Sequence, residues 1–164
     1  MSVEPDTWLR EHAAALGILP ALIGPHSCDV RLGRQIIEMK PGRRDIRYTL
    51  GDGEAFTFEP GAFYLCETAE HIAVPVSHRA QLHLKSSTAR RGLNHLMAAY
   101  IYAGWSGVLT LEFVAYLPVT FRQGERVMQI EYSRLTAPPE RPYSVTGRYQ
   151  GAQGVEKAKP EREP

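Results

Sequence analysis

Residues 108–116, with the sequence VLTLEFVAY, are the stretch that decides the fold. Leu109, Leu111 and Phe113 recur at every second position, and this period is typical of a β-strand that buries one face. Glu112 is the only charged residue of the stretch and belongs to the opposite face. The pattern predicts a strand with an apolar face in the core and a carboxylate on its other side.

Most of the chain around this strand has the same character. Short runs rich in β-branched and aromatic residues follow one another, and a turn signal closes each of them. These turn signals are Pro41-Gly42, Gly51-Asp52-Gly53, Pro60-Gly61, Pro75, Gly104, Pro118 and Gln123-Gly124. Many short strands at this spacing indicate a barrel or a sandwich, so the sequence predicts one all-β domain over residues 1–150.

Two helical segments interrupt this pattern. Asp6 is placed to cap a short N-terminal helix that Gly17 ends. Farther along, Ser86 or Ser87 is placed to cap a second short helix, which residues 93–98 either continue or replace with a strand. We favour a short helical turn followed by a strand.

Composition limits the classes of partner. The 164 residues include 19 basic and 18 acidic side chains, and the net charge of +1 gives no general attraction for a nucleic acid. The first residues, MSVEPDTWLREH, do not resemble a secretory signal, and no apolar run is long enough for a membrane span. We therefore expect a cytoplasmic protein without a membrane or nucleic-acid partner. Cys28 and Cys66 form no CxxC pair, so we expect both to be reduced and buried.

Three places carry candidate chemistry. Residues 85–92, KSSTARRG, gather hydroxyl groups and cations that can bind phosphate, although a capped surface helix has the same composition. Glu112 suits a general base if it faces a closed site, and it is a plain surface carboxylate if its face is open to water. In residues 103–107, AGWSG, two glycines let the backbone approach a flat ligand, or they form an ordinary turn with a packed Trp105.

Motifs for metal-dependent catalysis are missing. The six histidines fall in no HExxH pattern and in no HxE…PCxxC pattern, the second of which is typical of zinc deaminases. The chain also lacks a GxxxxGK[ST] phosphate loop and a GxSxG elbow. We therefore expect no zinc, and Mg²⁺ only as an ion carried by the phosphates of a ligand.

The end of the chain changes character at about residue 151. The glycine-rich GRYQGAQG at 147–154 is followed by the charged, proline-containing KAKPEREP at 157–164. We expect residues 151–164 to form a flexible tail. Such a tail either closes over an anionic ligand with Arg148, Tyr149 and Gln153, or frays as an ordinary terminus.

In this order, seven short stretches resemble the dCTP deaminases, which are the metal-independent branch of the dUTPase superfamily. They are residues 27–33 (SCDVRLG), 59–63 (EPGAF), 86–93 (SSTARRGL), 104–107 (GWSG), 111–113 (LEF), 124–129 (GERVMQ) and 148–151 (RYQG). An ordered set of matches is more specific than any single one.

The resemblance implies a distorted jelly roll, the dUTPase-like β-barrel, that assembles as a homotrimer with active sites shared between subunits. It implies a pyrimidine nucleoside triphosphate as ligand, and deamination of dCTP or a close cytosine nucleotide to the uracil nucleotide and ammonia. Glu112 would take a proton from a water that Ser86 and the backbone carbonyl of Ala98 also hold. Arg90 would keep the carboxylate ionised. The implied substrate-binding residues are Lys85, Ser87, Tyr100, Ile101, Tyr102, Trp105, Gln129, Tyr143, Arg148 and Gln153.

The chain departs from the family pattern in the tail at 149–154, in the length between Gly92 and Ala98, and most importantly at Tyr102. Family members usually read Ile-Asp-Pro-Gly where this chain has Ile101-Tyr102-Ala103-Gly104. In the family, the aspartate contacts the 3′-hydroxyl of the sugar, and in dUTPases it orients the water that attacks the phosphate. Tyr102 therefore weakens one alternative, a dUTP diphosphohydrolase or bifunctional enzyme. A non-catalytic nucleotide-binding trimer is the other alternative.

Overall fold

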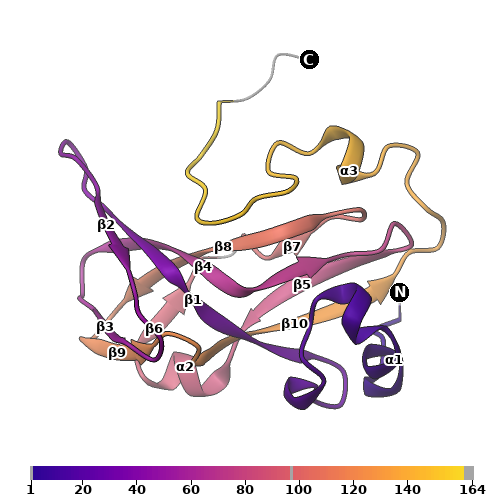
Figure 1. Cartoon of the computed structure of the whole chain (residues 1–164), viewed down its shortest axis with the longest axis horizontal. Coiled ribbons are helices and arrows are strands. Elements are labelled where there is room, and N and C mark those ends of the chain that lie inside the picture. The colour runs from indigo at the N-terminus through magenta and orange to yellow at the C-terminus, as the bar shows by residue number, and fades with distance from the viewer. Residues whose placement is uncertain (1, 97, 161–164) are drawn as a thin grey trace.

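The computed structural model describes residues 2–96 and 98–160, and nearly all of its regular structure is β-sheet (Figure 1). The helices are α1 (Asp6–Leu16), the 3-10 turn η1 (Pro20–Leu22), α2 (Ser86–Arg90) and α3 (Tyr143–Thr146). The strands are β1 (Cys28–Met39), β2 (Ile46–Thr49), β3 (Ala55–Phe58), β4 (Phe63–Ala73), β5 (His78–Leu84), β6 (Leu93–His95), β7 (Tyr100–Ile101), β8 (Ser106–Ala115), β9 (Val119–Arg122) and β10 (Arg126–Arg134). The prediction of an all-β fold with a short N-terminal helix is confirmed.

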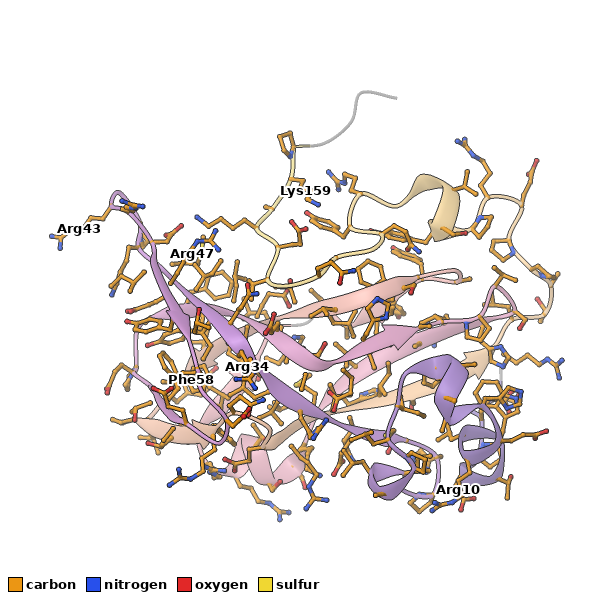
Figure 2. All side chains as sticks on the ribbon, in the orientation of Figure 1. Arg10, Arg34, Arg43, Arg47, Phe58 and Lys159 are labelled. Atoms are coloured by element: carbon orange, nitrogen blue, oxygen red, sulfur yellow. The ribbon has the colours of Figure 1, made fainter. Side chains whose placement is uncertain are left out.

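The strands form one curled antiparallel sheet in the order β6-β8-β4-β1-β10-β5-β7, while β3 and β9 pair separately. β2 extends β1 into a hairpin that projects from the body, and Arg43 points outward from its tip (Figures 1 and 2). The pairing register shifts at Val30/Arg31 and again between Glu67 and His71. Such bulges bend strands and increase their twist, so the sheet wraps around the core.

The core lies against the face of β8 that the sequence predicts to be apolar. Leu111 and Phe113 are completely buried, whereas Glu112 on the other face is only partly buried. Phe58 packs edge-to-face against Phe113 and Tyr64, with ring centroids 5.9 and 5.1 Å apart. These contacts join the small β3–β9 pair to the main sheet and hold β8 in a fixed position.

The predicted turns are also confirmed, since every turn signal falls in a connection between two strands. Helix α1 ends at Gly17 as predicted, where a φ of 68° places the backbone in the left-handed region that glycine favours. Cys28 and Cys66 are free and buried, as expected. The longest described helix, α1, has 11 residues, and no helix within the described ranges could cross a bilayer.

The two capping predictions are wrong, while the order of elements around α2 is right. Asp6 is the first helical residue and Pro5 precedes it, because the Asp6 carboxylate turns toward Arg10, 3.8 Å away, instead of bonding to the backbone. In α2 the capping position belongs to Lys85, since both serines already lie inside the helix, and no side chain caps it. The favoured order of a short helix followed by a strand is confirmed by α2 and β6.

Candidate active site

A cavity of about 610 Å³ opens on the side of β8 that faces away from the core. Thr110 and Glu112 of β8 form part of its floor, and Tyr102 and Trp105, which precede β8, form one wall. Residues from 147–158 cover it, and in Figure 1 this yellow segment passes over β8. The alternation of β8 therefore places its one carboxylate on the floor of this cavity.

More than half of the predicted site residues line this cavity. They are Ala98, Tyr100, Ile101, Tyr102, Trp105, Glu112, Tyr143 and Arg148. They come from two stretches of the chain, 98–112 and 143–148, which the fold brings together. The remaining predicted residues do not line the cavity, and these are Lys85, Ser86, Ser87, Arg90, Gln129 and Gln153.

Glu112 lies beside a buried histidine. Its side chain is 24% exposed, and Oε2 lies 3.2 Å from Nε2 of His95, whose side chain is 4% exposed. The angle between the two groups is not that of a hydrogen bond, and neither atom has another hydrogen-bond partner among residues 2–96 and 98–160. Glu112 thus offers the cavity a carboxylate that is held near an imidazole and is free to accept hydrogen bonds. Sequence reasoning missed His95, although its position two residues after Leu93 in a short strand is a signal for an inward side chain.

The wall of the cavity is aromatic. The rings of Tyr102 and Tyr143 lie nearly parallel, 8° apart, with centroids separated by 5.8 Å. Trp105 is tilted by 57° against Tyr143 at 5.5 Å, and its buried indole N–H has no acceptor in the described part of the chain. A wall of this kind can hold a flat ring against its aromatic faces. The buried Trp105 confirms the packed tryptophan that the AGWSG turn suggested.

The C-terminal segment is attached to β8 through its backbone. Val108 N–H donates to the Ala152 carbonyl at 2.8 Å, and Gly151 N–H donates to the Ser106 carbonyl at 2.8 Å. A Cβ atom on Gly107 would lie 2.9 Å from the Ala152 nitrogen, so only glycine allows this close approach. Ala152 is buried in this arrangement, whereas Gln153 points back to the Gly151 carbonyl and away from the cavity. The expected mobility of residues 151–164 stays a prediction, and residues 161–164 lie outside the described range.

Two of the predicted substrate-binding residues, Lys85 and Gln129, contact a second carboxylate together with Arg126. Asp29 accepts hydrogen bonds from Lys85 at 2.7 Å, from Arg126 at 3.2 Å and from Gln129 at 3.2 Å. The shared acceptor fixes the positions of these three donors. Because two of them are cations and Asp29 is one anion, the cluster keeps a net positive charge.

Ser86, Ser87 and Arg90 form a further group of donors, on α2. Their side chains are exposed and have no hydrogen bond or ion pair with any residue that the structure describes. One chain thus holds two sets of predicted site residues, a carboxylate in an aromatic cavity and a separate group of exposed donors.

Residues 6–135 match the family model described as dCTP deaminase-like, and the chain belongs to that family. It is 38% identical over 163 residues to the dUMP-forming dCTP deaminase of Mycobacterium avium, covering 87% of this chain and 86% of that one. The dUMP-forming dCTP deaminase of Methanopyrus kandleri is 35% identical over 150 residues, covering 81% and 78%. In fold, the chain resembles the crystal structure of the 2′-deoxycytidine 5′-triphosphate deaminase from Agrobacterium tumefaciens. The TM-score of this structural match is 0.67, and the sequence identity is 21%. The match covers 81% of this chain and 48% of the Agrobacterium chain.

Proposed function

We propose that this protein deaminates dCTP, or a close cytosine nucleotide, to the uracil nucleotide and ammonia without zinc. The observation that carries the proposal is the carboxylate of Glu112 on the floor of an aromatic-walled cavity. The names of the relatives, which are dCTP deaminases, support the same substrate. A flat pyrimidine would lie against the wall of Tyr102, Tyr143 and Trp105.

The reaction requires a water, a base and a leaving amino group. The oxygen of the water bonds to C4 of cytosine while its proton passes to the Glu112 carboxylate. Glu112 delivers that proton to N3 of the ring. The proton of the new C4 hydroxyl then passes to the amino group, the bond from C4 to that nitrogen breaks as C4=O forms, and ammonia leaves with the uracil nucleotide remaining. Proton transfer by a positioned carboxylate contributes about 10²–10⁴-fold to such a rate. Ala98 lines the same cavity, and its carbonyl would accept the second hydrogen bond of the water.

We propose that a neighbouring copy of the chain supplies the remaining groups. Ser86 and Arg90 are exposed donors without a partner among the described residues, and no described Lys or Arg forms an ion pair with the Glu112 carboxylate. Symmetric assembly places the same two surfaces opposite each other in every interface. In the homotrimer that we propose, Ser86 would hold the water and Arg90 would keep the neighbour's Glu112 ionised.

The phosphates of the ligand would lie near the same interface. Lys85, Ser87 and Gln129 would bind them from α2 and β10 of the neighbour, with Tyr143, Arg148 and Gln153 on the C-terminal side. The described residues bring together no group of three or more His, Cys, Asp or Glu that could hold a metal ion. Mg²⁺ would therefore be held by the phosphate oxygens, where it would offset part of their charge.

Ammonia release from dCTP in the presence of Mg²⁺ tests this function. We expect turnover by the natural sequence and a loss of at least about 10²-fold in Glu112→Gln, because the amide cannot take the proton. Glu140→Gln, at an exposed position outside the cavity, is the matched control and should keep full activity. If the folded protein releases no ammonia from any cytosine nucleotide, the proposal is wrong.

The relatives' names favour a second candidate, in which the same site also forms dUMP. That product requires pyrophosphate to leave as well as ammonia. By resemblance, Tyr102 stands where dUTPases have the aspartate that orients a water for attack on the phosphate. We therefore expect this protein to release ammonia from dCTP but no pyrophosphate. Equal amounts of both products would support the bifunctional enzyme.

A further inference from the structure

A second cavity, of about 570 Å³, lies beside the first and has no role in the proposed deamination. The two share Tyr100, Ile101, Tyr102 and Tyr143 as lining residues. The volume falls within the range of small-molecule sites in proteins. This cavity has a chemical character of its own, because Arg79 lies on β5 and Arg141 precedes α3, and neither lines the first cavity.

The second cavity contains positive charge that no described acidic side chain neutralises. The guanidinium of Arg79 lies 5.2 Å from the centroid of the Tyr100 ring, and its Nε is buried without a hydrogen-bond partner. Arg141 is exposed and has no ion pair among the residues described. No acidic side chain is among the described residues that line the cavity. A buried donor without an acceptor is costly, and Arg141 adds a second positive charge beside the Nε of Arg79, so this cavity favours an anionic ligand.

The rest of the lining suits a flat ring. Tyr100, Tyr102 and Tyr143 supply aromatic faces, and Pro139 and Pro142 supply rigid apolar surface. The lining includes no Asn, Gln, Asp or Glu that would read the edge of a particular base. Stacking on aromatic side chains tolerates any base, because every base has a π-face.

We propose that this second cavity is a binding site for a nucleoside phosphate, distinct from the Glu112 cavity. The phosphates contact Arg79 and Arg141, and the base stacks on the tyrosines without discrimination between purine and pyrimidine. Because Tyr102 and Tyr143 line both cavities, a ligand in one contacts the wall of the other. The two sites are therefore energetically coupled.

Equilibrium dialysis of the full chain with radiolabelled dATP tests this site without requiring turnover, so its outcome does not depend on the proposed deamination. We expect one dATP to bind per chain, and we expect radiolabelled dCTP to bind Glu112→Gln, which should not turn it over, at two sites per chain, because the second cavity accepts either base. Arg79→Ala and Arg141→Ala should each weaken dATP binding about tenfold or more, because each removes a charged hydrogen bond to phosphate. Arg44→Ala, an exposed arginine of the β1–β2 hairpin outside both cavities, is the control and should bind as the natural sequence does.

Two outcomes would overturn the proposal. One is a single dCTP site per chain for which dATP competes and which Arg79→Ala leaves unchanged, because both nucleotides would then bind in the Glu112 cavity. The other is the absence of dATP binding, or binding that neither arginine substitution changes. Arg141 is exposed, so its substitution should not affect folding, and equal melting temperatures of the variants would show this.

Discussion

Nε2 of His95 lies 3.2 Å from Oε2 of Glu112, and both atoms are buried and form no hydrogen bond within the described ranges. The imidazole also packs edge-to-face on Phe113, with centroids 5.7 Å apart. His95 does not line the cavity, so it would not contact a ligand there. We therefore interpret it as a positioning residue that fixes the direction of the Glu112 carboxylate.

Substitution of His95 separates positioning from binding. In His95→Ala we expect kcat for dCTP to fall about 10–100-fold, because small displacements of a catalytic group cost rates of this order. KM should change little, since no cavity contact is lost. His95→Gln, which keeps a polar group beside the carboxylate, should recover part of kcat. A variant with unchanged kcat and a raised KM would show instead that His95 serves binding.

Tyr102 is expected to select the sugar. Its ring is 64% exposed and stacks on Tyr143 at the cavity wall, where the resemblance places a sugar-binding aspartate. Tyr102→Asp should therefore raise kcat/KM for plain dCTP, because the smaller carboxylate can accept a hydrogen bond from the 3′-hydroxyl. Tyr116→Asp, at a similarly exposed tyrosine outside the cavity, is the control. Unchanged steady-state kinetics in Tyr102→Asp would exclude this position from the sugar pocket.

The two buried cysteines should be unreactive in the folded protein. Burial, with the nearby charge of Glu70, raises the pKa of Cys28 from 9.0 to about 11, and burial raises the pKa of Cys66 well above 9.0. Since thiolates react and thiols do not, iodoacetamide at pH about 8 should modify both slowly until urea unfolds the chain. Rapid modification of the native protein would contradict this burial.

These raised pKa values also predict the direction of a pH effect on stability. Below pH 9 both thiols are protonated in the folded and unfolded states, so their contribution to the free energy of unfolding is fully present. As the pH rises from about 9 toward 11, the unfolded state releases protons that the folded state retains, and stability falls. The urea midpoint should therefore drop over this interval, and by less in Cys28→Ala. An identical drop in that variant would assign the effect to other groups.

Local patterns were sufficient for the strands and turns but not for the caps. The alternation in residues 108–116 predicts both the buried face of β8 and the position of Glu112. The caps depend on which backbone group a side chain reaches, and Asp6 has an alternative in Arg10 that composition does not reveal. His95 was missed for a related reason, because its partner lies 17 residues away on another strand.

The site shows the same division between local and long-range information. Tyr102, Trp105 and Glu112 are close in sequence, and the structure gathers them in one cavity. Arg79 and Arg141 belong to no motif, since only folding brings β5 near the segment before α3. Contact between Glu112 and Arg90 needs a second copy, and for that reason it stays a proposal here.

Mixing two inactive variants tests the shared site most directly. Glu112→Gln and Arg90→Ala should each be inactive alone, because each damages every site of its own trimer. The two variants are unfolded together and refolded. Every trimer that contains both variants regains one intact site, because one of its interfaces pairs a natural Glu112 with a natural Arg90. The rate of dCTP deamination should therefore return to about a quarter of the natural rate. Mixed trimers that release no ammonia, or Arg90→Ala with full activity by itself, would contradict a site completed by a neighbouring copy.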